Sequence, residues 1–245
     1  MNYKLLLQYD GTKLNGWQKQ GNTDNTIQGK LEEILKKTYG TEIEVCGSGR
    51  TDAGVHALGQ VANFHAPAVY SVEEIQNILN EYLSKDIRIL QVETADERFH
   101  ARLSAKGKTY EYHIDNGKVA NVFQRKYAMR EEAPLDLEAM KEACVYFLGT
   151  HDFKTFCANK KMKKSTVRTI TSIMIEEKDG MVVIRYTGNG FLYNMVRILT
   201  GTLIEVGRGK KKAEEMKEVL EAMDRGAAGF TAPAQGLFLV EVSYT

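Results

Sequence analysis

An aspartate flanked by glycines is the part of the sequence best suited to chemistry. Residues 47–57 read GSGRTDAGVHA, so Asp52 lies two residues after Arg50 and four before His56. Glycines let a backbone approach a ligand closely, and a carboxylate can act as a nucleophile or as a base. Composition alone favours a plainer interpretation, a solvated loop in which Arg50 and Asp52 form a local ion pair. Both interpretations start from the same residues, so the surroundings of Asp52 must decide between them.

Other kinds of site do not fit this segment. It has neither the GxxxxGK[ST] spacing of a phosphate loop nor the GxGxxG fingerprint of a dinucleotide site. Ser48, Asp52 and His56 could form a triad, but no GxSxG motif is present, and geometry rather than sequence proximity defines a triad. The five histidines lack HExxH or similar ligand spacing. We therefore expect no metal and no cofactor.

The elements that must position this segment begin with a strand, a loop and a helix. Residues 3–9 read as a strand that ends at Asp10-Gly11, and a helix follows after residue 25. Ser71 and Glu74 form the S-x-x-E pattern of a capping box, which predicts the start of a second helix. Strands are predicted at residues 60–65 and 87–94. The apolar face of the first helix comprises Ile27, Leu31, Ile34 and Leu35.

A second, similar round of elements follows. We predict a strand at 108–114, a helix over 137–148 ended by Gly149, and a hairpin of 169–175 and 181–186 across Lys178-Asp179-Gly180. Helices near 192–206 and 213–223 precede a last strand at 237–244. This order favours an α+β fold over a regularly alternating parallel sheet. The least structured boundary lies near 98–107, which predicts halves of residues 1–103 and 104–245 that share one continuous sheet.

Composition is compatible with a soluble protein that binds nucleic acid, without requiring it. The 245 residues are 43% apolar, enough for a buried core, and 33 basic against 32 acidic residues leave a net charge of +1. Positive charge is nevertheless concentrated in two clusters, of which the first is denser and is predicted to lie in a loop. These are Lys160, Lys161, Lys163, Lys164 and Arg168, and then Arg208, Lys210, Lys211 and Lys212.

The cysteines and the hydropathy pattern indicate a cytoplasmic location. Cys46, Cys144 and Cys157 are odd in number and form no CxxC pair, so we expect three separate reduced thiols. No stretch approaches the roughly 20 apolar residues that cross a membrane.

The string GSGRTDAGVHA resembles the catalytic motif of the tRNA pseudouridine synthase A family. Further matching motifs run along nearly the whole chain. They are YDGTKLNGWQKQ near the start, GKTYEYHI at 107–114, GTHDFKTF at 149–156, GNGFLYNMVRILTG at 188–201 and APAQGLFL at 232–239.

This resemblance implies a fold, an activity and a set of site residues. The fold would be two similar α/β halves that share a central, mostly antiparallel sheet with a cleft between them. The activity would be cofactor-free isomerisation of uridine to pseudouridine at positions 38 to 40 in the anticodon arm of tRNA, by a homodimer. The family's catalytic aspartate becomes Asp52, its active-site tyrosine Tyr110 and its MVR-motif arginine Arg197. Arg50 precedes the aspartate as in the family, and Leu237 matches its apolar pocket residue.

Chemical reasoning gives these residues roles. A carboxylate that must stay ionised in a closed pocket needs a cationic partner, so we expect Arg197 to pair with Asp52. Arg50 and the basic cluster at 160–168 would contact phosphates, while Tyr110 would stack on the flipped uracil and relay a proton. Two alternatives stay open, a catalytically silent RNA-binding protein and a hydrolase with Asp52 as nucleophile, although no paired second carboxylate is evident.

Overall fold

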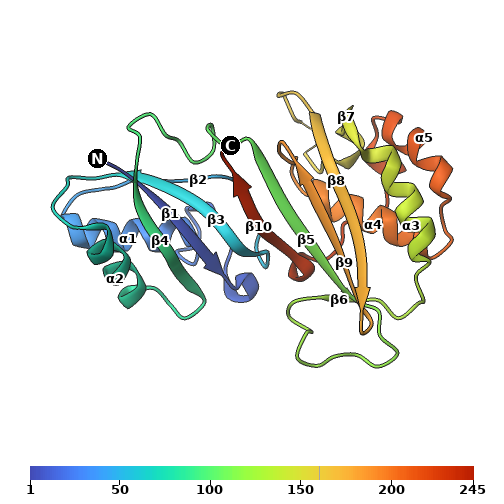
Figure 1. Ribbon diagram of the computed structural model, residues 1–245, viewed down its shortest axis with the longest axis horizontal. Helices are drawn as coiled ribbons and strands as arrows, with labels where there is room; N and C mark the ends of the chain where they lie inside the picture. The colour runs from blue at the N-terminus through green and yellow to red at the C-terminus, as the bar shows by residue number, and fades with distance from the viewer. Residues whose placement is uncertain (160) are drawn as a thin grey trace. The chain divides into compact units, whose positions relative to one another are not determined.

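The computed structural model describes residues 1–159 and 161–245, and the chain divides into two compact units (Figure 1). Unit 1 consists of Met1–Lys106 and Phe238–Thr245, and unit 2 consists of Gly107–Leu237. The chain thus leaves unit 1 after Lys106 and returns to it with its last strand. In the described part of the chain, no helix has the length and apolarity needed to cross a membrane.

The sheet of unit 1 is built around strand β3 (His56–His65). Its neighbour β1 (Asn2–Tyr9) pairs antiparallel with it and with β4 (Ile87–Ala95) on the other side. Two strands share the remaining edge of β3. β2 (Val45–Gly47) pairs antiparallel with its end, and β10 (Leu237–Ser243) pairs parallel with its start through Phe238 and Leu239. The segment that contains Asp52 is therefore the connection between two paired strands, β2 and β3.

The helices of unit 1 agree with the sequence patterns. Helix α1 (Ile27–Tyr39) buries its predicted apolar face, and α2 (Val72–Tyr82) packs against β4 and α1. The predicted capping box is confirmed, because Ser71 Oγ accepts from the Glu74 amide at 3.2 Å and the Ser71 amide donates to the Glu74 carboxylate at 2.7 Å. Strand β3 starts four residues earlier than predicted. Gly59 concealed its start, since a strand pattern weakens at glycine, and here a Cβ would lie 2.3 Å from the Val240 oxygen.

Unit 2 contains an antiparallel sheet with the strand order β5-β9-β8-β7. The strands are β5 (Gly107–Asp115), β9 (Met181–Gly188), β8 (Val167–Lys178) and β7 (Gly149–Asp152), and the short β6 (Met129–Arg130) runs parallel to the end of β5. The predicted hairpin is confirmed: Lys178 pairs with Met181, and the two residues between them have positive φ, 54° at Asp179 and 79° at Gly180. Those angles are typical of the type I′ turn that Asp-Gly favours.

Helices α3 (Leu137–Cys144), α4 (Met195–Gly207) and α5 (Met216–Glu221) complete unit 2. α4 contacts β5 and α3, and its residues 198–204 are all buried, as expected of a helix that is apolar on every side. It starts three residues later than predicted because Asn194 has left-handed backbone, with φ of 60°. The predicted helix over 137–148 ends at Cys144 and continues as one 3₁₀ turn.

Both units combine helices with a mostly antiparallel sheet, which confirms the α+β class. Cys46, Cys144 and Cys157 are free thiols, as predicted, and the latter two are buried.

Candidate active site

Asp52 lies in a tight turn within the connection from β2 to β3. Its carbonyl accepts from the Val55 amide at 3.1 Å, and Gly54 has a φ of 81°, which side chains with a Cβ rarely adopt. Val55 is buried, Asp52 is half-buried and Arg50 is exposed. The segment therefore holds its aspartate at the surface of unit 1 while its backbone is packed against the protein.

The motif near the N-terminus packs directly against this turn. Gly16, at φ of 87°, could not carry a Cβ, which would lie 2.7 Å from the Thr51 oxygen. The Trp17 amide donates to the same oxygen at 3.0 Å, and the Trp17 ring would lie 2.4 Å from a Cβ on Gly47. These contacts give a physical reason for two of the glycines in the matched motifs.

A buried polar network, which we name the Gln60 clamp, fixes the residues just before Asp52. Gln60 Oε1 accepts from Ser48 Oγ at 2.6 Å, and Gln60 Nε2 donates to the Gly49 oxygen at 3.1 Å and to Tyr9 Oη at 3.4 Å. Tyr9 Oη lies 2.8 Å from Thr51 Oγ1. The clamp comprises Tyr9, Ser48, Thr51 and Gln60, all buried. The Gln60 amide therefore holds Ser48 and Gly49 directly, and it holds Thr51, the residue before Asp52, through Tyr9.

Tyr9 stays neutral in this network at physiological pH. Burial raises the pKa of its phenol to about 12, and the hydrogen bonds to Thr51 and Gln60 offset only part of that effect. Sequence reasoning missed both Tyr9 and Gln60. A usable signal existed, because Gln60 and Asn63 are amides within an otherwise largely apolar strand, and buried amides need partners.

His56 supports the other end of the segment. It is 1% exposed, its ring stacks on Phe238 at 4.7 Å between centroids, and Nδ1 accepts from the Gly11 amide at 3.0 Å. Nδ1 also lies 3.2 Å from the Asp10 carboxylate. Ser48 is fully buried and donates its hydroxyl to Gln60, so it cannot reach a substrate carbonyl. The geometry does not support the triad interpretation.

Three further predicted site residues belong to unit 2. Tyr110 lies in β5 opposite Tyr186, and its ring meets Phe191 edge-on at 5.3 Å between centroids. Arg197 occupies the first turn of α4, where Nε donates to the Ala232 oxygen at 2.7 Å and Nη1 to Asn194 Oδ1 at 2.9 Å. These two bonds orient the guanidinium.

The segment before Leu237 is held in place by Tyr112 of β5. Tyr112 Oη donates to the Pro233 oxygen at 2.7 Å, and a Cβ on Gly236 would lie 2.7 Å from the Tyr112 ring. Burial raises the pKa of Tyr112, although the nearby Arg197 lowers it somewhat. Leu237 is 7% exposed at the start of β10. The chain that leads into Leu237 therefore packs against Tyr112 of the GKTYEYHI motif within unit 2.

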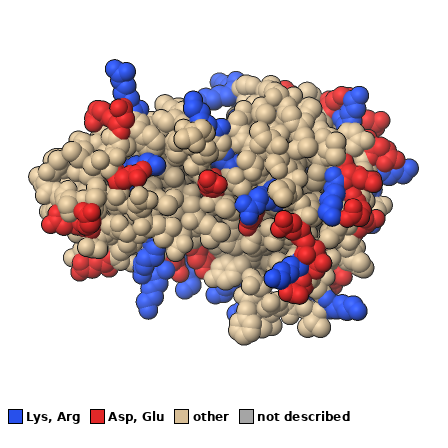
Figure 2. Space-filling model, viewed as in Figure 1, with Lys and Arg blue, Asp and Glu red and all other residues tan. Residues whose placement is uncertain are grey.

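The two basic clusters differ in their contacts. In the second, Arg208 forms an ion pair with Glu131 through its Nε and Nη2 atoms, and Lys211 lies 3.6 Å from Glu205. In the first, the lysines at 161, 163 and 164 are exposed, Arg168 donates to the Ser165 oxygen at 3.0 Å, and Lys160 lies outside the described residues. On the face drawn in Figure 2, positive and negative side chains are interspersed.

The structure assigns the predicted residues to two groups. Asp52 and Arg50 belong to unit 1, whereas Tyr110, Arg197 and Leu237 belong to unit 2. In residues 1–159 and 161–245, no group of three His, Cys, Asp or Glu side chains is arranged to hold a metal ion.

Comparison with protein families identifies the class of this chain. A family model described as tRNA pseudouridine synthase matches residues 6–103 and 143–245. The chain belongs to the tRNA pseudouridine synthase family, which confirms the resemblance noted from its motifs. Asp52, Arg197 and Leu237 lie inside the matched stretches, and Tyr110 lies between them.

Curated relatives match the chain over nearly its full length. A protein of Bacillus sp. (strain KSM-64) named tRNA pseudouridine synthase A is 49% identical, with 99% of both chains covered. Proteins of Acetivibrio thermocellus and Clostridium perfringens, named tRNA pseudouridine synthase A and A 2, are 46% and 48% identical with the same coverage. Among solved structures, a chain of a Cbf5-Nop10-Gar1 complex matches with a TM-score of 0.35 and 17% identity, covering 72% of this chain and 40% of that one. That likeness is too weak to support an argument.

The family and these relatives establish the kind of activity. The chain is an isomerase that converts uridine in tRNA to pseudouridine.

Proposed function

We propose that this enzyme acts on uridines at positions 38 to 40 in the anticodon arm of tRNA, with Asp52 as its essential residue and without a cofactor. The observation that carries the proposal is the position of Asp52, half-buried in a turn whose flanking residues are fixed by the Gln60 clamp and by His56. A catalytic group held in one position needs no rearrangement when the substrate arrives.

The reaction requires one carboxylate and a closed pocket. The bond from ribose C1′ to uracil N1 breaks, the base turns while bound, and a bond from C1′ to C5 forms as H5 leaves and N1 gains a proton. Asp52 can attack C1′, add to uracil C6 or abstract a ribose proton, and each route needs the ionised carboxylate. Exclusion of water protects the reactive sugar from hydrolysis.

The other site residues receive supporting roles. Arg197 pairs with Asp52 and keeps it ionised, a role that suits a guanidinium already oriented by Ala232 and Asn194. Tyr110 stacks on the flipped uracil and relays a proton, and Leu237 forms the apolar wall of the pocket. In this division of labour, residues 1–103 contribute the aspartate and residues 104–245 contribute the tyrosine and arginine motifs.

Basic side chains would hold the RNA backbone and offset the cost of flipping a base, which is a few kcal/mol. Arg50 is exposed two residues before Asp52 and suits a phosphate contact. The denser cluster contributes further contacts through Lys160, Lys161, Lys163, Lys164 and Arg168. We also propose that the enzyme is cytoplasmic and that it acts as a homodimer. Light scattering of the purified protein, which gives its molar mass, tests the homodimer.

Release of tritium from tRNA labelled at uridine C5 tests the proposal. Wild-type protein and Asp52→Asn are compared in buffer that contains a chelator, with Asp24→Asn, a change at an exposed carboxylate of the same unit, as the matched control. We expect release from the wild type and the control, and none from Asp52→Asn. Tight tRNA binding by all three without release would instead indicate a silent RNA-binding protein, and free uracil would indicate a hydrolase. Mapping pseudouridine in the product tests positions 38 to 40.

A further inference from the structure

The connection from β5 to β6 in unit 2 exposes an unusual group of apolar side chains. Val119 and Phe123 are each 84% exposed and Val122 is 60% exposed, all within residues 116–128, which we name the 116–128 loop (the long loop beside β6 in Figure 1). Nothing in the catalytic proposal uses this loop. It also lies outside both stretches that the family model matches.

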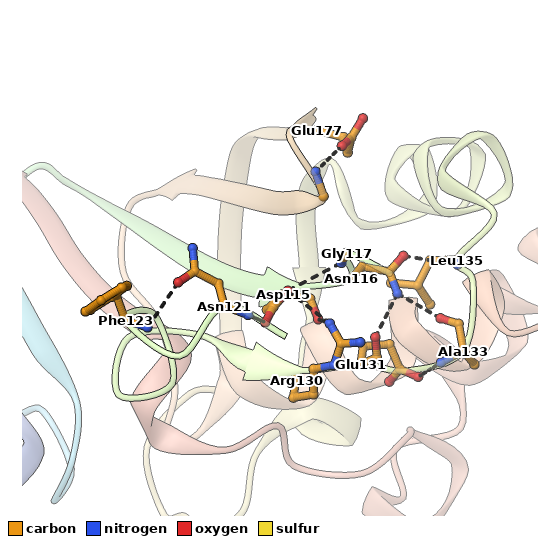
Figure 3. A network of polar contacts seen from close by, with 11 residues as sticks. Asp115, Asn116, Gly117, Asn121, Phe123, Arg130, Glu131, Ala133, Leu135 and Glu177 are labelled. Atoms are coloured by element: carbon orange, nitrogen blue, oxygen red, sulfur yellow. Dashed lines mark hydrogen bonds and ion pairs between the residues drawn. The ribbon is translucent and has the colours of Figure 1, made fainter. Parts of the chain in front are cut away.

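The start of the loop is fixed to the sheet by a polar network (Figure 3). The buried carboxylate of Asp115 accepts from the Gly117 amide at 3.3 Å and the Asn121 amide at 2.9 Å, and pairs with Arg130 at 3.0 Å. The Asn116 side chain donates to the Glu131 oxygen at 2.9 Å and to the Ala133 oxygen at 2.8 Å. The chain just before and just after the loop is therefore held in one place.

The rest of the loop has internal bonds of its own. The Phe123 amide donates to Asn121 Oδ1 at 3.0 Å, and the Tyr127 amide donates to the Gln124 oxygen at 2.8 Å. The Gln235 side chain donates to the Ala128 oxygen at 3.4 Å, which connects the end of the loop to the segment before Leu237. The loop that carries the exposed phenyl ring of Phe123 is therefore held by hydrogen bonds at several points along its length.

All the charged side chains of the 116–128 loop are positive. Residues 116–128 contain Lys118, Arg125 and Lys126 and no acidic residue. The acids that border the loop, Asp115 and Glu131, are paired with Arg130 and Arg208 respectively. Exposed aromatic rings beside cations are the usual means of holding single-stranded nucleic acid, because a ring can stack on any base while the cations contact phosphates.

We propose that the 116–128 loop is a second contact for the tRNA substrate, in which Phe123 stacks on an unpaired base and Lys118 and Arg125 contact the neighbouring phosphates. The inference rests on the proposed function, since it takes tRNA as the ligand. Contact between two copies of the loop is disfavoured because it would bring like charges together. The cavity of about 720 Å³ between the loop and the sheet is lined partly by Glu176 and Asp179, so RNA is expected on the outer side of the loop.

Replacing Phe123 by alanine tests the stacking contact. We expect the KM for tRNA to rise roughly 5- to 150-fold, which corresponds to about 1–3 kcal/mol for the loss of one stacking ring, with little change in kcat. Phe123→Trp should restore the wild-type KM, because a larger ring stacks as well. Tyr82→Ala, a change at a 69% exposed aromatic on α2, is the matched control and should leave KM unchanged. Both positions are exposed, so the variants are expected to fold.

Salt dependence tests the phosphate contacts. The variant with Lys118→Gln and Arg125→Gln should show a slope of log Kd for tRNA against log salt that is smaller by about 1 for each phosphate that the loop no longer binds. Unchanged KM in Phe123→Ala, or an unchanged salt slope, would overturn the proposal. A lower molar mass of Phe123→Ala in light scattering would assign the loop to contact between copies and overturn it as well. If the wild type released no tritium, the proposed function would fail, while Kd for tRNA would still report on the loop.

Discussion

Replacing Gln60 by alanine should lower the rate of turnover much more than the accompanying loss of stability can explain. The substitution removes the acceptor of Ser48 Oγ and the donor to the Gly49 oxygen and to Tyr9 Oη. Each buried polar group left without a partner costs about 1–3 kcal/mol, so we expect a loss of roughly 2–5 kcal/mol in the free energy of unfolding. The residues before Asp52 would then shift, and a displacement of about 1 Å at a catalytic group can lower the rate about 100-fold.

Asn63 provides a control in the same strand. Its side chain is 3% exposed and bonds to Asn2 Oδ1 at 3.0 Å and to the Ala101 amide at 2.8 Å, so it holds the segment near residue 100 instead of the Asp52 turn. Asn63→Ala should therefore lose a similar stability and keep its rate.

The assay is single-turnover tritium release at a temperature where circular dichroism shows both variants folded. We expect Gln60→Ala to react about 100-fold more slowly than Asn63→Ala, with similar affinities for tRNA. Rates within about threefold of each other would refute the reasoning, because the Gln60 clamp would then contribute only to stability.

Three further predictions concern individual side chains. Tyr110→Phe should keep its KM and lower kcat by about 100-fold if the hydroxyl relays a proton, and unchanged kcat would leave only stacking. Gly47→Ala forces a methyl to 2.4 Å from the ring of Trp17, the one tryptophan of the sequence, so urea unfolding followed by Trp17 fluorescence should show a loss of about 1–3 kcal/mol in the free energy of unfolding. Equal stability would contradict this close packing. The pKa of Tyr9 is about 12 when folded and about 10 when unfolded, so its contribution is complete below pH 10 and lost as pH rises towards 12. As the pH rises from 10 to 12, the wild type should lose about 3 kcal/mol of its free energy of unfolding through Tyr9, and Tyr9→Phe should lack this loss. Identical pH profiles of unfolding for the two proteins would contradict the raised pKa.

Local sequence signals predicted the elements that they control directly. The capping box of Ser71 and Glu74 fixed the start of α2, and Asp179-Gly180 marked the hairpin, because both depend on a few neighbouring residues. Short strands such as β2 and β7 were missed, since three or four residues show no periodicity. The end of α3 was predicted too late, because the 3₁₀ turn at 145–147 continues the same apolar spacing.

The candidate site was predicted by motif and completed by the structure. Asp52 stood out because its glycine-rich string is distinctive, and the family match agrees with that recognition. The sequence marks Gln60 as a strand amide that needs partners, but it does not show which ones, because the pairing of β1, β2 and β3 is what brings positions 9, 48 and 49 to it. Tertiary hydrogen bonds of this kind have no sequence period to reveal them.

The shared edge of β3 has a consequence for synthesis on the ribosome. The start of β3 finds its partner in β10, which emerges only after all of unit 2 has been made. Until then His56 lacks the ring of Phe238, and the backbone next to the Asp52 turn is an open strand edge on the nascent chain. The last strand thus closes the first unit, and the backbone beside the Asp52 turn gains its β10 partner only when Phe238 and Leu239 have left the ribosome.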